Sequence, residues 1–138
     1  MAMTIDVEHS DGPARCAILA LTGELDASNY EQVMAAIEQA WASGARGLAL
    51  DLTHLSFMAS SGLIALYTAV RVFRGDAPPD PESGWSALHE LGNDQGVAQN
   101  VRLIGVQPPV ERVLERTGLR RLFAVDPDRA AAVSALGG

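Results

Sequence analysis

Apolar and polar positions along this chain follow the periods of strands and helices in turn. Met3, Ile5 and Val7 alternate with polar neighbours, which is the period of a half-buried β-strand. The run from Cys16 to Leu21 is apolar on both faces, and so is the shorter run from Leu48 to Leu50. Strands covered on both sides have this composition. We therefore expect one edge strand followed by two central strands.

Three further stretches carry apolar residues three or four positions apart, which is the spacing of an amphipathic helix. They predict helices over residues 28–43, 60–73 and 108–117. Ser28 is followed three residues later by Glu31, a capping-box pattern that predicts the start of the first helix. We expect these helices to face a sheet.

The C-terminal part of the chain continues the alternation. Strands are expected over 101–106 and 122–125, with Gly118 as the left-handed end of the helix between them. The pair Asp126-Pro127 is expected to cap and start a closing helix. This alternation predicts an α/β fold with about four or five strands. The residues expected in its core are Val33, Ile37, Leu50, Leu66, Val70, Leu103 and Leu114.

Residues 75–99 interrupt this pattern. Pro78, Pro79 and Pro81 leave little room for regular structure. The segment holds five acidic residues and no arginine, so it contributes −5 to the formal net charge of −7. We interpret it as an insertion between the second helix and the fourth strand of a single domain spanning residues 1–138. Loops of this length are functional or disordered, so it is either a partner-specific element or a mobile excursion.

Composition excludes several classes of protein. The chain has a net charge of −7 and no lysine, so it lacks the basic surface that binds nucleic acid or anionic membranes. No apolar run approaches the ~20 residues that a membrane span needs, and we expect a cytoplasmic protein. Cys16 is the single cysteine; it cannot form an intramolecular disulfide and is expected in the core.

The residues that carry most enzyme chemistry do not gather in this sequence. His9, His54 and His89 stand far apart without the spacing of metal ligands, so neither a metal nor a cofactor is expected. The chain has no Gly-x-Ser-x-Gly motif, and without lysine it cannot form a P-loop. We therefore expect no catalytic residue.

Three segments carry a family pattern. They read Leu-Thr-Gly-Glu-Leu-Asp at 21–26, Leu-Ser-Phe-Met-Ala-Ser-Ser-Gly-Leu at 55–63, and Pro-Pro-Val through Thr-Gly-Leu at 108–119. In this order they resemble the STAS family of bacterial anti-sigma factor antagonists. The resemblance implies the STAS fold, a mixed sheet packed against helices.

In that family the serine at the position of Ser60 begins a helix and is phosphorylated by a partner kinase that is also the anti-sigma factor. The resemblance therefore implies an antagonist that binds a serine kinase of the histidine-kinase-like ATPase type and is switched off by phosphorylation. Such proteins regulate transcription, for example in stress responses or sporulation. Ser61, one residue further into the helix, is the alternative acceptor. A helix start suits a phosphate because its free amides and partial positive charge accept a dianion.

Asp26, Ala59 and Gly62 complete the implied partner-binding surface with the two serines. Asp26 matches a family acid on the same surface, although it could equally only cap the nearby helix. Gly62 lets a partner backbone approach, or simply fits the helix against a neighbouring strand. Members of the family usually carry Asp where this chain has Ala59. That departure leaves open slower phosphorylation, a changed partner preference, a constitutive binder or an engineered change.

Other interpretations compete with this one. A STAS domain can also serve as an adaptor subunit of a membrane-associated transport or signalling complex. A small hydrolase using either serine would need a base and an oxyanion hole, which the sequence does not locate. Ser60 could also be an ordinary N-cap that contributes about 1 kcal/mol. The sequence names neither the cognate kinase and sigma factor nor the oligomeric state.

Overall fold

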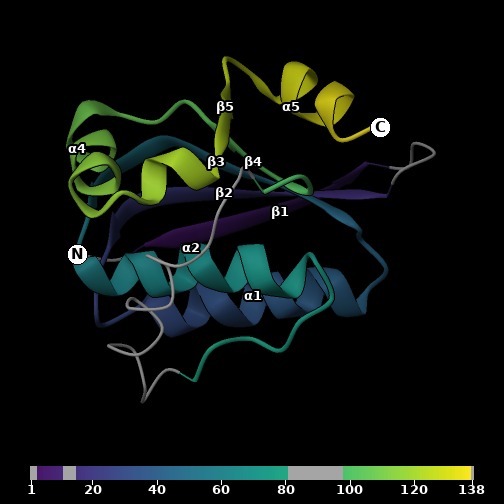
Figure 1. The fold of residues 1–138 in the computed structure, drawn as a ribbon, viewed down its shortest axis with the longest axis horizontal. Helices are drawn as coiled ribbons and strands as arrows, with labels where there is room; N and C mark the ends of the chain where they lie inside the picture. Colours follow the sequence, from purple (N-terminus) through teal and green to yellow (C-terminus); the bar gives the residue numbers. More distant parts are fainter. Residues whose placement is uncertain (1–2, 11–14, 81–97, 138) are drawn as a thin grey trace.

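A five-stranded sheet in the order β1-β2-β3-β4-β5 forms the centre of the computed structural model (Figure 1), which describes residues 3–10, 15–80 and 98–137. β1 is antiparallel to β2, and every other neighbouring pair is parallel. The elements are β1 (Thr4–Ser10), β2 (Cys16–Leu25), α1 (Tyr30–Ala42), β3 (Gly47–Met58), α2 (Ser60–Val72), β4 (Val101–Ile104), α4 (Pro108–Thr117), the 3-10 turn η2 (Leu119–Leu122), β5 (Ala124–Asp126) and α5 (Arg129–Ala135). The expected α/β class with a mixed sheet of four or five strands is confirmed.

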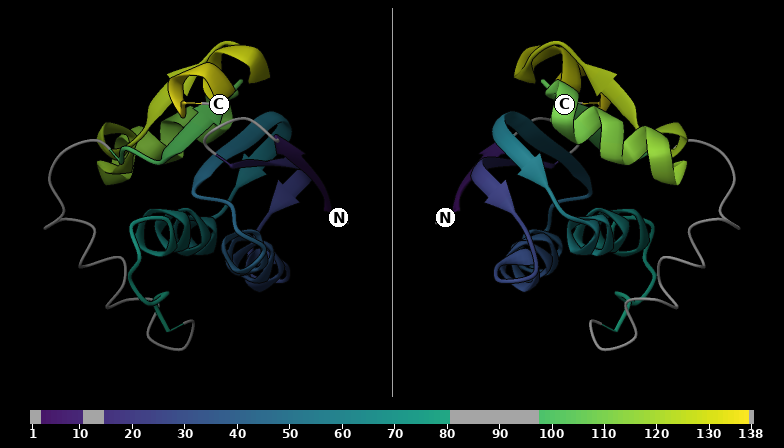
Figure 2. Two further views of the ribbon diagram at one scale, coloured as in Figure 1. Left: turned by 90° about the vertical axis from the view of Figure 1, so that its right-hand side faces the viewer. Right: turned by 90° about the vertical axis from the view of Figure 1, so that its left-hand side faces the viewer.

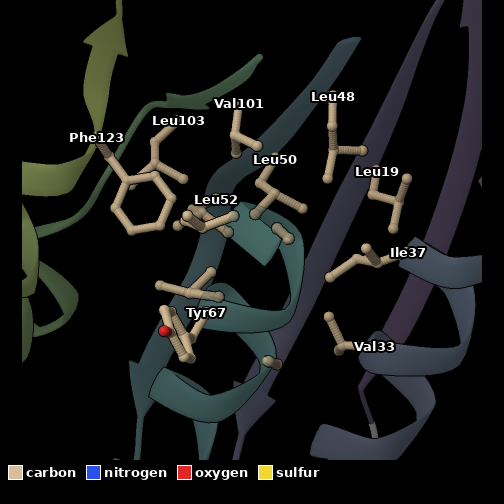
Figure 3. Close-up of a cluster of buried hydrophobic side chains, with 14 of the residues drawn as sticks. Leu19, Val33, Ile37, Leu48, Leu50, Leu52, Tyr67, Val101, Leu103 and Phe123 are labelled. Carbon is tan, nitrogen blue, oxygen red and sulfur yellow. The ribbon is translucent and has the colours of Figure 1, made fainter. Parts of the chain in front are cut away.

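Alternate residues of the central strands point to opposite faces of the sheet. Leu19, Leu48 and Leu50 face α1 and α2, which lie side by side beneath the sheet and bury their apolar faces against it (Figures 2 and 3). The residues expected in the core are all buried there: Val33, Ile37, Leu50, Leu66, Val70, Leu103 and Leu114. The helical and strand periods of the sequence thus predict the core correctly.

The opposite face is covered by α5 and contains charged groups. Ile18, Ala49, Ile104 and Ala132 form a small apolar cluster there. Beside it, Arg129 Nε donates to Asp51 Oδ2 at 2.9 Å, and Arg129 Nη1 lies 2.7 Å from Glu8 Oε2. A second pair is bidentate, with Arg102 Nε and Nη2 donating to the two carboxylate oxygens of Asp126 at 2.5 and 3.0 Å. Ion pairs therefore connect the strands and α5 on this face.

Two helix caps differ from the sequence prediction. The N-cap of α1 is Asn29, and the Ser28 hydroxyl donates instead to Asp26 Oδ1, so the capping box with Glu31 does not form. The N-cap of α5 is Asp128, whose carboxylate accepts from the Ala131 amide at 2.8 Å. Asp126 does not cap this helix because its carboxylate is buried and bound to arginine. The two expected caps fail for different reasons, because Ser28 is held by a local hydrogen bond to Asp26 and Asp126 by a tertiary ion pair with Arg102.

The last two strands are shorter than predicted. β4 ends at Ile104 because Gly105 turns the chain with φ +63°, and a Cβ at this position would clash with Thr53 Oγ1. β5 begins at Ala124 because Leu122 still belongs to η2. Gly118 has φ +77° and ends α4 in the left-handed conformation, as predicted.

The segment predicted as an insertion starts at the C-terminal end of α2. Its first residues are tied to that helix, since Arg71 Nε donates to the Ala77 carbonyl at 2.7 Å and Pro79 is buried. Residues 81–97 of the predicted insertion, including Pro81 and His89, lie outside the described residues. The start of α2, with Ser60, is at the opposite end of the helix.

Candidate functional site

Parallel pairing brings the ends of β2 and β3 to one edge of the sheet. Leu25 and Met58 are the last paired residues of the two strands, and the Ala59 amide then donates to the Leu25 carbonyl at 2.8 Å. Asp26 directly follows Leu25 in the sequence, and Ser60 directly follows Ala59, so both residues adjoin this hydrogen bond. We call this region, residues 23–30 and 55–62, the carboxyl edge; α1 and α2 both begin there (Figure 1).

Ser60 is the first residue of α2 and is exposed to solvent. The N-cap is Ala59, and the Ser60 hydroxyl makes no hydrogen bond with any described residue, so the interpretation of Ser60 as an N-cap is wrong. The first turn of α2 contains no acidic residue. Its amide groups therefore present a partial positive charge, which no acidic residue of the same turn offsets, beside an accessible hydroxyl.

Ser61 points the other way. Its hydroxyl oxygen is buried and has no hydrogen-bond partner in the described part of the chain. No described histidine or carboxylate forms a hydrogen bond with either serine hydroxyl, so the described residues place no base where a hydrolase nucleophile needs one. Of the two serines, Ser60 carries the hydroxyl that a second protein can reach.

Gly62 is buried between the helix and the strand ends. A Cβ at this position would lie 2.6 Å from Met58 Cγ and 3.0 Å from Leu25 Cγ and Cδ2. The absence of a side chain therefore lets the first turn of α2 pack closely on β2 and β3. This geometry favours the fit against neighbouring strands over the close approach of a partner.

Asp26 lies in a braced loop between β2 and α1. Its Oδ1 accepts from the Ser28 hydroxyl at 2.5 Å and from the Ser28 amide at 2.9 Å. These hydrogen bonds, the side-chain one first, hold the pKa of Asp26 below its usual range. Its Oδ2 takes part in no hydrogen bond among the described residues. Asp26 is therefore an ionised, partly exposed acid, and the cap of α1 is provided by another residue.

Two residues of the carboxyl edge were missed in the sequence. Asn29 braces the loop, since its Oδ1 accepts from the Asp26 amide at 2.9 Å and its Nδ2 donates to the Glu24 carbonyl at 2.8 Å. Its position just before a helical pattern is a signal that could have found it. Phe57 is exposed, although strand alternation would place it on the buried side with Leu55. No simple periodicity predicts that exposure.

Other kinds of site have no support in residues 3–10, 15–80 and 98–137. No group of three histidine, cysteine, aspartate or glutamate residues is placed to hold a metal ion. Burial raises the pKa of the Cys16 thiol, which disfavours the reactive thiolate. Within these ranges no helix has the length and apolar character to span a membrane.

Comparison with known proteins places this geometry in context. A family model described as "STAS domain" matches residues 4–76, just over half of the chain. The crystal structure of an anti-sigma factor antagonist from Mycobacterium paratuberculosis is similar, with a TM-score of 0.67 and 21% identity over 99% of this chain and 96% of that chain. An anti-sigma-factor antagonist (STAS) domain protein from Planctomyces limnophilus gives a TM-score of 0.60 and 19% identity, covering 97% and 98% of the two chains.

A third similar structure is that of the Bacillus cell fate determinant SpoIIAA in its phosphorylated form. Its TM-score is 0.55, with 19% identity over 95% of this chain and 98% of that chain. At these identities the likeness concerns the fold. It extends over nearly the whole chain, including the part beyond residue 76 that the family model does not match.

Proposed function

The chain belongs to the STAS-domain family, and we propose that it is an anti-sigma factor antagonist that binds its anti-sigma factor through the carboxyl edge. The partner is a serine kinase of the histidine-kinase-like ATPase type, and phosphorylation of Ser60 switches binding off. In this role the chain is a cytoplasmic binding module and not an enzyme. By occupying the anti-sigma factor it would release a sigma factor for transcription.

The accessibility of Ser60 is the observation that carries this proposal. Its hydroxyl is exposed at the first residue of α2, whereas the Ser61 hydroxyl is enclosed. A phosphate on Ser60 would meet free amides and the positive end of the helix dipole, so the fold should tolerate it. The same dianion would be unfavourable in an interface, because the partner surface would remove the water that solvates it.

Ala59 modifies the site without removing the acceptor. It is the N-cap of α2, with φ −82° and ψ 168°, and its backbone position does not require a particular side chain. The carboxylate that related antagonists carry at this position is absent. The nearby acid is Asp26, which is ionised and directly follows Leu25, the hydrogen-bond partner of the Ala59 amide. We infer that phosphorylation still occurs at Ser60.

Variants of Ser60 test the proposal against the anti-sigma kinase encoded in the same genome. Ser60→Asp should bind the purified kinase at least tenfold more weakly than wild type, because it places a charge in the interface. Ser60→Ala should bind like wild type and resist release when ATP is added. Ser134→Asp, at an exposed serine of α5, is the matched control for added charge and should bind normally.

Calorimetry before and after ATP measures the binding, and mass spectrometry locates the phosphate. Phosphate on Ser60 together with release of the wild-type chain supports the proposal. Equal affinity for the wild type and both Ser60 variants, with no phosphate on any serine, would mean that Ala59 has silenced the switch. Phosphate found on Ser61 alone would show that Ser61 is the acceptor and would contradict the assignment of Ser60.

A further inference from the structure

Phe57 is one of two large apolar side chains that the described residues expose, with 44% of its surface accessible; the other is Val7 in β1, with 48%. The two differ in place. Phe57 lies three residues before Ser60 at the carboxyl edge, whereas Val7 pairs with Leu19 in the middle of the edge strand. An exposed phenyl ring next to the phosphoacceptor requires a structural explanation.

A β-bulge in β3 turns Phe57 outward. Gly23 and Glu24 are consecutive in β2, but their partners in β3 are Leu55 and Phe57, so Ser56 is the extra residue. In a regular strand Phe57 would point to the same side as Leu55, which is fully buried. The bulge shifts the alternation by one residue, and Met58 becomes the buried residue instead.

Both strands hold this bulge in place. The Ser56 hydroxyl donates to the Gly23 carbonyl at 3.1 Å, across the two strands. Gly23 has φ +110°, a conformation that favours glycine. The outward direction of Phe57 is thus built into the backbone of β2 and β3 and does not depend on a single rotamer.

The surroundings of Phe57 are acidic. Glu24 is its direct neighbour in β2, and Asp26 follows two residues later. The segments 22–31 and 53–63 contain three acidic residues and no arginine. Arg15 and Arg46 precede β2 and β3 at the opposite edge of the sheet. The chain therefore presents an aromatic side chain within a negatively charged border at the edge that carries Ser60.

We propose that Phe57 is the apolar anchor of the partner surface and fits a hydrophobic pocket rimmed by arginine or lysine on the anti-sigma factor. Aromatic side chains in the centre of an interface carry a large share of the binding energy. The acids around it steer the encounter and select a basic rim. The inference rests on the proposed function, because it names the chemistry of that same interface.

Affinity for the purified anti-sigma kinase tests the anchor. Phe57→Ala should weaken binding about 30-fold or more, the effect expected of a central aromatic residue. Phe57→Leu should lose only part of the affinity, because it keeps an apolar side chain. Val7→Ala removes the other exposed apolar side chain and should bind within about twofold of wild type. Thermal unfolding of each variant checks that the fold is retained.

The role of the acidic residues beside Phe57, Glu24 and Asp26, is tested by the kinetics of binding. Asp26→Asn and Glu24→Gln should lower the association rate and flatten its dependence on salt, with a smaller change in the dissociation rate. An association rate of the wild type that does not change between low and physiological salt would overturn the basic rim.

The outcomes separate this inference from the proposed function. If wild type binds the kinase and Ser60→Asp does not, but Phe57→Ala binds like wild type, the anchor is wrong and the proposed function stands. If wild type itself does not bind the kinase, the proposed function fails and the anchor fails with it. Loss of binding in Phe57→Ala and not in Val7→Ala supports the anchor.

Discussion

The two faces of the sheet are closed by different kinds of interaction. On the face covered by α1 and α2, leucine, valine and aromatic side chains form one large apolar core (Figure 3). On the face covered by α5, four residues form the apolar cluster, and Asp51, Arg129 and Glu8 form ion pairs beside it. One layer is held mainly by burial, and the other partly by charge.

This difference bears on the proposed function because Ser60 begins α2, a helix of the apolar layer. Burial of apolar surface does not titrate, so the position of α2 should be insensitive to acid. Ion pairs weaken as carboxylates become protonated, so the α5 layer should respond to pH. We expect local opening to start in the α5 layer, with α2 among the last elements to open.

The largest effect is expected from a cavity in the apolar layer. Leu50→Ala removes a fully buried side chain of β3 and should lower the free energy of unfolding by about 3 kcal/mol. Leu136→Ala is the matched change next to the α5 cluster, where the side chain is only partly buried, and should cost about 1 kcal/mol. Urea denaturation measures both. Equal losses would show that the two layers do not differ.

A methyl group at Gly62 tests the packing of α2 on the ends of β2 and β3. Gly62→Ala places a Cβ 2.6 Å from Met58 Cγ, where Met58 and Leu25 are both buried, and the over-packing should exceed the gain in helix propensity. We expect a net loss of about 2 kcal/mol by chemical denaturation. Ser60→Ala, at the exposed position two residues earlier, should change stability by less than about 0.5 kcal/mol. A more stable Gly62→Ala variant would contradict the tight fit.

The apolar layer was also the part that the sequence predicted best. Helical spacing and continuous apolar runs report burial directly, so the core residues and the three main helices were predicted correctly. The charged layer was not predicted, because Asp51 lies in an apolar run and its partner Arg129 follows 78 positions later. Nothing local connects such residues, and only the topology of the sheet brings them together.

The candidate site was predicted in outline, through family resemblance. The structure brings Asp26, Ala59 and Ser60 to one edge, as parallel strands require, while their roles stay proposals. The exposure of Phe57 depends on a bulge, which shifts the strand alternation by one residue. A hydrophobicity pattern alone does not reveal that shift, so period-two reasoning would place Phe57 inside.

The charged layer can be weakened at Arg129. Burial alone would raise the pKa of Asp51, but hydrogen bonds from Thr53 and Arg129 outweigh it and lower the pKa. Because the folded pKa lies below the unfolded value of about 3.9, the stabilisation is complete above that pH and is lost as the pH falls through the folded pKa. Arg129→Gln should therefore lower stability by about 1 kcal/mol at pH 7, since Arg129 is partly exposed.

The pH dependence distinguishes this effect from simple loss of packing. Without Arg129 the folded pKa of Asp51 should rise, so the difference between wild type and Arg129→Gln should shrink as the pH falls below about 4. Arg112→Gln, at an exposed arginine of α4, is the control and should match wild type at every pH. A difference that is constant from neutral to acid pH would show that Asp51 is not responsible.

The smallest predicted effect has the opposite sign and concerns Ser61, next to the proposed acceptor Ser60. The Ser61 hydroxyl is buried without a partner among the described residues, and an enclosed polar group that makes no hydrogen bond destabilises the folded state. Ser61→Ala removes that group without adding volume, so it should raise the free energy of unfolding by about 0.5–1 kcal/mol. Ser60→Ala should give no such gain, because its hydroxyl is solvated. If Ser60 is the acceptor, Ser61→Ala should still be phosphorylated by the kinase in the presence of ATP, and Ser60→Ala should not. A destabilised Ser61→Ala variant would mean that the hydroxyl has a hydrogen-bond partner in solution, and the contrast between an enclosed and an accessible serine would then no longer select Ser60.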